Sequence, residues 1–544
     1  MKAITTPKLP DLSSKLPVAI IGAGPVGLAA AAHLLSRDLR PLILEAGPSV
    51  ASHLESYRHV RLFSPWRYNV DAQARTLLER AGWRAPDPDV LPAAGEVIDQ
   101  YLAPLANIRV VAEALRYNTR VLSIARKGFD KVKTAGRDAA TFTLRVRTPN
   151  GDADLEAWAV IDASGTWGTP NPLGANGLPA RGEKKLAHRI AYGMPDVLGH
   201  QRSRYAGKRV LVAGAGHSAA GTLIQLSTLA EQVPQTQLVW TIRGHNFQRI
   251  FGGGANDGLP ARGALGERLR VLRDAGRLEL HADFKVSELT MDKLGITVAG
   301  ERTDGSAHSI EGIDEIIVCA GGRPDHSLSS ELRVKLDPWL ESTEQLAPLI
   351  DPNVHSCGTV RPHGHRELQH PESRFYAVGA KSYGRAPNFL LATGHEQVRS
   401  VVAALAGDFK AADEVHLELP QTGVCSSQFV EGEDTGCCTV GNSADETAQV
   451  ADGCGTGSCG TPSRLPAIPA WQGDLLKVAS TAKPTVASAP ASCCGGPPLK
   501  RADACCVTDE VAKDAGDAGC GCSAEPLAPK LPKQAEQRKT TCCA

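Results

Sequence analysis

Cysteine is concentrated at one end of this 544-residue chain. Thirteen of the fifteen cysteines follow Pro420, and eight of those form four vicinal pairs. Adjacent thiolates can share one soft ion, because sulfur prefers soft acceptors such as Cu(I), Zn and, by the same reasoning, trivalent metalloids. Ten cysteines are therefore candidate metal ligands: Cys437, Cys438, Cys493, Cys494, Cys505, Cys506, Cys520, Cys522, Cys542 and Cys543.

The segment that carries these thiols, residues 421–544, is rich in Ala, Gly, Pro, Ser and Thr. This composition buries too little apolar surface to offset the entropy of ordering, so we predict a disordered tail. Three interpretations of its cysteines stay open: a trap for metal or metalloid, a redox-active tail reduced by the rest of the chain, and a linker with incidental cysteines. The segment lacks the regularly spaced CxxC pairs of a zinc ribbon.

A glycine-rich turn near the N-terminus predicts a first dinucleotide site. An apolar run at residues 17–21 leads into GAGPVG at residues 22–27 and an alanine-rich helix through about Leu35. Strand, glycine turn and helix in this order are typical of a Rossmann fold. The free N–H groups and positive dipole end of such a helix favour phosphate.

Each glycine of this turn has a distinct expected role. Gly22 permits the tight turn, Gly24 lets a pyrophosphate approach the backbone, and Gly27 lets the helix pack closely on the strand. Pro25 stands between them at the start of the expected helix. The next apolar run ends at Glu45, whose carboxylate can accept hydrogen bonds from a ribose diol.

A second turn repeats the pattern. The run at residues 208–213 is followed by Gly214 and Gly216, with Ala219 in the third position, and by a helix. The next predicted strand ends at Arg243 rather than at an acid. Because a guanidinium can pair with a 2′-phosphate that a carboxylate would repel, this site favours NADPH over NADH.

Two such folds about 190 residues apart indicate an α/β protein with one cofactor that stays, FAD, and one that comes and goes, NADPH. Strand-like runs at 313–324 and 374–379 are interpreted as the FAD fold resuming after an inserted NADPH domain, with Gly379 ending the second run. The expected organisation is a first part of the FAD domain at 16–170, the NADPH domain at 171–312, a second part of the FAD domain at 313–416, and the tail at 421–544.

Charge and hydropathy exclude several classes of protein. Lys plus Arg and Asp plus Glu both number 59, so no broad electrostatic footprint for nucleic acid or an anionic membrane is visible. No apolar run approaches the length of a spanning helix, and the first residues lack a secretory h-region. We therefore expect a soluble cytoplasmic protein without a nucleic-acid or membrane partner, whose thiols stay reduced.

The order of these pieces resembles the two-dinucleotide-binding flavoproteins, and within them the flavin-containing monooxygenase-like branch. Residues 160–167 (VIDASGTW), followed by Pro170 and Pro172, are similar to that branch's "ATG" segment and include Gly165 as a cofactor-binding position. The acid that the family places at the FAD ribityl group is replaced by the sequence Gly-Ala-Lys at 379–381. The linker motif of the monooxygenases is not cleanly present either.

Three segments, 59–69, 192–198 and 381–389, look like flavoproteins that accompany bacterial arsenic-resistance genes. The resemblance implies a small-molecule substrate, with a trivalent arsenical or another soft metal as the candidate. It also implies a catalytic role for Asn69, which lies where the related branch has an asparagine near the flavin. The alternative is that Asn69 caps a turn before a helix that begins near Val70.

The body of the chain has no cysteine pair of the kind that disulfide reductases place beside the flavin. Cys319 lies in an apolar run and is expected in the core. Cys357 falls in a His-rich stretch, 355–370, which we interpret as a surface loop rather than a metal site. Three hypotheses follow: a monooxygenase-like FAD- and NADPH-dependent oxidoreductase, a flavin reductase of its own tail thiols or a bound metal, and a sequestering protein without activity.

Overall fold

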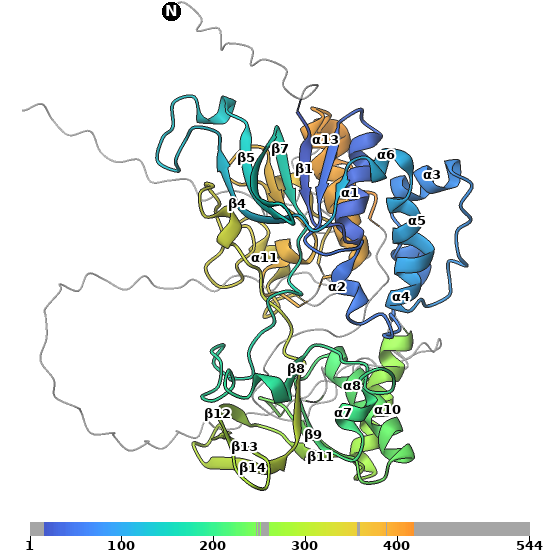
Figure 1. The fold of residues 1–544 in the computed structure, drawn as a ribbon, viewed down its shortest axis with the longest axis vertical. Coiled ribbons are helices and arrows are strands. Elements are labelled where there is room, and N and C mark those ends of the chain that lie inside the picture. The colour runs from blue at the N-terminus through green and yellow to red at the C-terminus, as the bar shows by residue number, and fades with distance from the viewer. Residues whose placement is uncertain are drawn as a thin grey trace, which may run out of the picture. The chain divides into compact units, whose positions relative to one another are not determined.

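The first sheet is parallel and combines segments that lie far apart in the chain (Figure 1). The computed structural model describes residues 16–417 except 246, 248–250, 252–259, 356–359 and 388. The strand order is β16-β7-β1-β2-β3. These strands are β1 (Val18–Ile21), β2 (Pro41–Leu44), β3 (Leu115–Arg116), β7 (Ala159–Asp162) and β16 (Phe375–Ala377). The central strand β1 pairs with β2 on one side and β7 on the other, so that Ile21 lies beside both Leu44 and Asp162.

The second sheet is also parallel, with the order β11-β10-β9-β15-β8. Its strands are β8 (Ile190–Tyr192), β9 (Arg209–Ala213), β10 (Gln237–Thr241), β11 (Glu279–His281) and β15 (Glu315–Val318). Two parallel sheets of Rossmann type, the first of them completed by a late strand, confirm the predicted α/β fold class.

The expectation that the FAD fold resumes at residue 313 is wrong. β15 pairs with β9 and β8, so it is a strand of the second sheet. The run at 315–318 is buried throughout and fits the middle of either sheet, and its partners are set by pairing with distant strands rather than by its own residues. The chain returns to the first sheet in β16, which pairs with β7.

Two linkers connect the folds and are hydrogen-bonded to each other. The N–H of Asn171 donates to the Gly321 carbonyl at 2.9 Å, and the N–H of Arg323 donates to the Thr169 carbonyl at 3.0 Å. The Asn171 side chain also donates to the Ala320 carbonyl at 3.0 Å. The outgoing and returning segments are thereby joined where the chain passes between its two sheets.

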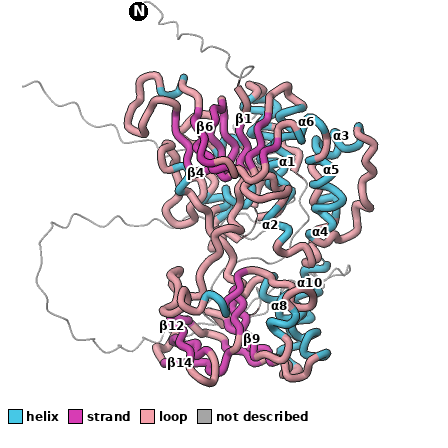
Figure 2. Tube along the Cα trace, in the orientation of Figure 1, coloured by secondary structure: helices cyan, strands magenta, loops and turns pink. Residues whose placement is uncertain are grey.

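Each large sheet packs against a smaller antiparallel sheet of three strands, drawn among the magenta segments of Figure 2. One contains β4 (Arg120–Arg126), β5 (Phe142–Thr148) and β6 (Gly151–Ala157), and the other contains β12 (Lys285–Met291), β13 (Ile296–Glu301) and β14 (Ala307–Ile313). Alternate residues of β5 are buried and exposed, as expected of a sheet with one solvated face.

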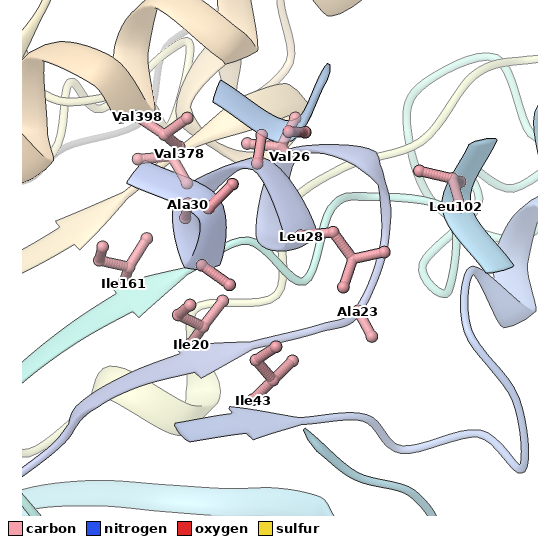
Figure 3. Close-up of a cluster of buried hydrophobic side chains, with 14 of the residues drawn as sticks. Ile20, Ala23, Val26, Leu28, Ala30, Ile43, Leu102, Ile161, Val378 and Val398 are labelled. Carbon is pink, nitrogen blue, oxygen red and sulfur yellow. The ribbon is translucent and has the colours of Figure 1, made fainter. Parts of the chain in front are cut away.

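Helices α1 (Pro25–Leu35) and α13 (Leu391–Leu405) pack on the first sheet. Figure 3 shows Ile20 and Ile161 from the strands and Val398 from α13 around Ala30 of α1. The alanines at 29–32 are all fully buried, which brings the helix close to the strands. Helices α8 (His217–Gln232) and α10 (Pro260–Asp274) pack against each other beside the second sheet.

The remaining α-helices of the described residues are short. They are α2 (Ser52–Glu55), α3 (Ala72–Arg80), α4 (Ala94–Val97), α5 (Ala103–Ala106), α6 (Arg109–Ala112), α7 (Arg202–Tyr205), α11 (Ala347–Ile350), α12 (His365–Leu368) and α14 (Phe409–Asp413). Within that part of the chain, no helix is both long enough and apolar enough to cross a membrane.

A buried ionic cluster secures the segment that precedes β16. Glu372 accepts from Arg126 at 2.7 Å and from Arg137 at 2.8 Å, and all three side chains are almost completely buried. Arg126 also lies over the Phe142 ring. Because one carboxylate joins residues more than 230 positions apart, the returning chain is fixed to the part made before the insertion.

Candidate cofactor sites

The first glycine turn has the geometry that its sequence predicts. Gly22 has a φ of +98°, and a Cβ at Gly27 would lie 2.0 Å from the Gly22 carbonyl oxygen. A Cβ at Gly24, in contrast, would meet no protein atom within 4 Å. The first and third glycines are therefore needed by the chain itself, whereas the second faces open space at the start of α1, where Pro25 occupies the first turn. This cradle fits a dinucleotide pyrophosphate.

Glu45 lies directly after β2, and its side chain connects the glycine turn to the segment that follows β2. One carboxylate oxygen accepts from the Ala23 N–H at 2.8 Å and the other from the Gly47 N–H at 2.7 Å. The side chain is thereby fixed beside the turn, and each oxygen keeps a further lone pair that can accept from a ribose hydroxyl.

The second turn repeats this arrangement. Gly214 has a φ of +144°, and a Cβ there would lie 2.4 Å from the Cys319 carbonyl oxygen. A Cβ at Gly216 would meet nothing within 4 Å. Ala219 is fully buried in the core of this fold. The site again combines a close-packed first position with an open second position at the start of α8.

Arg243 follows β10 and is exposed. Its guanidinium donates one hydrogen bond, to the Ala175 carbonyl at 3.1 Å. A guanidinium with several remaining N–H donors can pair with a phosphate in two-point geometry. The strand end of the second fold thus carries a cation where that of the first carries Glu45.

Gly165 and Gly379 follow β7 and β16 on the same edge of the first sheet. Both have positive φ, +70° and +68° respectively. A Cβ at Gly379 would lie 3.3 Å from Val26 in the first turn of α1. The Gly379 N–H donates to the Gln397 side chain of α13 at 2.7 Å. These contacts place Gly379 beside the N-terminal end of α1 and its glycine turn.

An ion pair that the sequence patterns did not reveal lies at this same edge. Lys381 lies in the 3-10 turn at Gly379–Tyr383, and its ammonium is 2.5 Å from the Asp162 carboxylate at the end of β7. Ser164 donates to the other Asp162 oxygen at 2.6 Å. The available signals were a charged residue at the end of an otherwise apolar strand, at 159–162, and the sequence Gly-Ala-Lys at 379–381 where the family has an acid after its glycine.

Hydrogen bonds between uncharged side chains hold the other side of the turn at Gly379–Tyr383. The Gln397 amide donates to Ser382 at 2.9 Å and to the ring of His363 at 3.0 Å. The His363 Nδ1 lies 3.1 Å from the Arg361 carbonyl, so the ring donates there and accepts from Gln397. Burial lowers the pKa of His363, and the histidine is therefore neutral at pH 7.

Asn69 is buried within its own loop. Its amide N–H₂ donates to the carbonyls of Ser64 at 2.7 Å and Pro65 at 3.0 Å, and its amide oxygen accepts from the Ser64 hydroxyl at 3.1 Å. It ends the 3-10 turn at Trp66–Tyr68, whereas Asp71 caps α3. The described contacts are those of a residue that closes a turn.

The body cysteine that the structure describes is unsuited to redox chemistry. Cys319 is buried, and its thiol donates to the Gly193 carbonyl at 3.2 Å. Burial raises the pKa of this thiol to about 12, so the thiolate that would act as nucleophile is not formed at neutral pH. The core position predicted for Cys319 is confirmed.

The prediction of a surface loop at residues 355–370 is wrong for its described part. His363, His365 and His370 are all buried, and α12 begins at His365. His365 packs against Phe409 and contacts Asp413, which ties this stretch to α14. Across the described ranges, no group of three or more His, Cys, Asp or Glu side chains is placed to hold a metal. Cys357 and the ten candidate tail ligands lie outside those ranges.

Comparison with known proteins identifies a family and several solved structures with a similar fold. The family model described as pyridine nucleotide-disulphide oxidoreductase matches residues 19–358. A curated relative, indole-3-pyruvate monooxygenase YUCCA1 of Oryza sativa subsp. japonica, is 29% identical over 199 residues. That match covers 37% of this chain and 42% of the relative, so the chain matches less than half of the relative's length.

Two solved structures share the fold. The bacillithiol disulfide reductase Bdr (YpdA) from Bacillus cereus has a TM-score of 0.54 at 18% identity, over 72% of this chain and 99% of its own. The FAD-bound cadaverine monooxygenase DfoA from Erwinia amylovora has a TM-score of 0.50 at 14% identity, over 77% of this chain and 99% of its own.

The family match covers more than half of the chain and includes both glycine turns. It rests on the dinucleotide-binding framework and not on a redox cysteine pair, because residues 19–358 contain Cys319 and Cys357 as their two cysteines, 38 positions apart. The chain therefore belongs to the pyridine nucleotide-disulphide oxidoreductase family, as a flavin-dependent oxidoreductase with FAD and NADPH as its cofactors.

Proposed function

We propose that the protein is a monooxygenase-like enzyme that uses NADPH, oxygen and a soft small-molecule substrate, with a trivalent arsenical as the leading candidate. When bound, FAD would take hydride from NADPH and pass electrons to the acceptor. The overall reaction balances: dioxygen takes two electrons from NADPH and two from trivalent arsenic, one oxygen atom is bound by arsenic, and the other leaves as water.

The observation that carries this proposal is the state of Cys319. A disulfide reductase of the dithiol type passes electrons to two neighbouring thiols, but this thiol is buried, protonated and hydrogen-bonded to a backbone carbonyl. The first dinucleotide turn and the sequence around it contain no cysteine. We therefore propose that the electrons leave to a small molecule rather than to a dithiol of the body.

Different residues of the two glycine turns would bind FAD and NADPH. Gly24 and Gly216 leave room for the pyrophosphates, Glu45 would accept from the ribose of FAD, and Arg243 would pair with the 2′-phosphate of NADPH. Gly22, Gly27, Gly214 and Ala219 shape these turns, while Gly165 and Gly379 line the adjoining edge. We further propose that Asn69 turns its amide toward the reacting position when substrate is bound.

The thiols of the tail would bind the same trivalent arsenical. Each vicinal pair can place two thiolates on one trivalent arsenic, and the second bond gains from the high effective concentration set by the first. The similarity of residues 59–69, 192–198 and 381–389 to flavoproteins of arsenic-resistance clusters supports this assignment. We therefore propose that the protein is cytoplasmic and acts in arsenic or soft-metal detoxification.

A second function is favoured by the family itself. Its description pairs pyridine nucleotide with disulphide, and a disulfide formed in the tail or brought by a small molecule would be a chemically suitable acceptor. In this alternative NADPH would reduce a disulfide through the flavin without oxygen. A sequestering protein without activity would do neither.

Steady-state NADPH oxidation separates the three functions. We expect oxidation in air to be stimulated by arsenite and to yield pentavalent arsenic in amounts equal to the oxygen consumed. Turnover without oxygen, on addition of a small disulfide such as cystine, would support the reductase instead. Cys319→Ala is the matched control, since removal of a buried protonated thiol should leave either turnover unchanged.

The thiol trap is tested by removing the tail. Deletion of residues 421–544 removes no cofactor motif, so flavin content should be retained while bound arsenite falls sharply. A full-length variant with the four vicinal pairs changed to serine controls for loss of the chain itself. Equal arsenite stoichiometry in the three proteins would eliminate the trap, and loss of flavin on truncation would show that the tail belongs to the fold.

A further inference from the structure

The first fold carries an open groove at the end of α1 that is opposite to the glycine turn. The groove has a volume of about 610 Å³ and lies between the C-terminal end of α1, the helix α3 and the chain at residues 411–416. The glycine turn lies at the other end of this 11-residue helix, which is about 16 Å long. The groove is therefore separate from the site assigned to FAD.

The lining of this groove is basic, with three arginines, two histidines and a single acid. Arg399 is already bound to Glu396 through two of its nitrogens. Arg37 makes one ion pair, with Asp408 at 3.0 Å, and keeps further N–H donors. Arg80 is exposed at the end of α3, and its guanidinium pairs with none of the described residues. Two arginines of the groove can therefore bind an acidic ligand.

The groove also offers apolar surface beside these arginines. Leu35 and Leu77 line it and are only half-buried, and Ala411 lines it as well. An apolar side chain placed against the two leucines would remove this surface from water. The lining therefore suits a segment in which an apolar residue stands close to several acids.

The chain that follows the groove has this character. His416 lines the groove, and the described part of the chain ends at residue 417. From 418 to 463 the sequence contains no lysine or arginine and seven acids, Glu418, Glu431, Glu433, Asp434, Asp445, Glu446 and Asp452. Three of these acids lie within residues 431–434, directly after Phe429 and Val430.

The connection between groove and acidic segment is short. A flexible chain of the length between residues 417 and 429 spans about 20 Å on average. Such a tether keeps the segment at an effective concentration on the order of millimolar at the groove, so that weak contacts suffice to hold it there. We propose that residues 429–434 dock in this groove, with Phe429 against the two leucines and the acids on Arg37 and Arg80.

Docking would determine where the first vicinal cysteine pair lies. Cys437 and Cys438 follow Asp434 closely in the sequence, so they would be held near the C-terminal end of α1. The glycine turn is at the other end of that helix, so a soft ion on this pair would be bound away from the flavin. The docking itself does not depend on the proposed reaction.

Chymotrypsin cleavage of the full-length protein tests the docking, because Phe429 is a cleavage site inside the docked segment and Trp471 is a reference site beyond it. Arg80→Glu replaces attraction by repulsion. It should raise cleavage at Phe429 relative to Trp471 by about 3- to 10-fold, since proteolysis follows the population of the undocked segment. Arg75→Glu is the matched control, because Arg75 is exposed on the same helix but does not line the groove. It should leave the ratio unchanged.

Charge reversal on both sides completes the test. Changing Glu431, Glu433 and Asp434 to arginine should expose Phe429, and adding Arg37→Glu and Arg80→Glu to that variant should protect it again. Equal cleavage at Phe429 in the unaltered protein and in Arg80→Glu would overturn the proposal, and so would failure of the combined variant to recover protection. Protection that increased with protein concentration would also overturn it, because the groove would then hold the tail of a second copy.

Discussion

The two dinucleotide turns share a backbone and differ in the side chains around it. In both, the first glycine has positive φ and abuts a carbonyl oxygen, and the second opens onto empty space. In the first turn Glu45 is bound to the backbone of the cradle, whereas in the second the exposed Arg243 ends the equivalent strand. We infer that the shared turn would accept a pyrophosphate of either cofactor, and that the residue at the strand end would distinguish one dinucleotide from the other.

The largest effect is expected from Gly24→Val. A Cβ at this position meets no protein atom within 4 Å, so the flavin-free chain should keep its melting temperature, but the valine would occupy the space expected for the FAD pyrophosphate. We expect purified protein without its yellow colour, measured as the ratio of flavin to protein absorbance. Full flavin occupancy in this variant would refute the assignment of the first turn.

Gly216→Val should have the complementary effect at the second turn. The position is equally open, so folding and flavin content should be unchanged, while NADPH binding should be lost. Equilibrium titration of the yellow protein with NADPH would measure this. If flavin were released instead, the two turns would not be independent sites.

Arg243→Ala should weaken NADPH binding by about 1.5–3 kcal/mol, the usual worth of a charge-assisted contact, and leave NADH nearly unaffected. The two coenzymes should be compared in parallel titrations at one ionic strength. Equal losses for both would mean that Arg243 supports the loop through Ala175 and does not recognise the 2′-phosphate.

The smallest effect is expected from Ala219→Gly, which gives the second turn the residue of the first. Loss of helix propensity and of one buried methyl group should reduce the free energy of unfolding by about 1–2 kcal/mol. NADPH affinity should not change, because the third position faces the core and not the ligand. Denaturant titration and coenzyme binding on the same variant would check both statements.

The glycine turns could be predicted because their signal is local. The strand, the turn and the helix follow one another within about 20 residues, and each glycine meets a steric demand of its own turn. The membership of β15 could not be predicted in this way, since a buried strand with three apolar residues after Glu315 is equally suitable for either sheet. Its neighbours are determined by pairing over about a hundred residues.

The polar part of the site was less predictable. The alternative that Asn69 caps a turn before a helix agrees with the structure, in which the asparagine closes the turn at Trp66–Tyr68 and α3 begins after Asp71. The pairing of Lys381 with Asp162 joins residues 219 positions apart and leaves no periodic pattern in the sequence. Such contacts follow from the assembled sheet, so sequence indicates that a charge is out of place without identifying its partner.

The late position of β16 and α13 has a consequence for the order of folding. The second sheet is complete once Val318 has been synthesised, whereas the first sheet lacks its edge strand β16 until Ala377, and α1 lacks its packing partner α13 until Leu405. During synthesis the inserted fold can therefore form first. The first fold forms later, because it needs contacts between residues far apart in the chain. We expect chains truncated after residue 340 and released to protect the second fold from protease but not to bind FAD, and released chains that extend past residue 417 to do both.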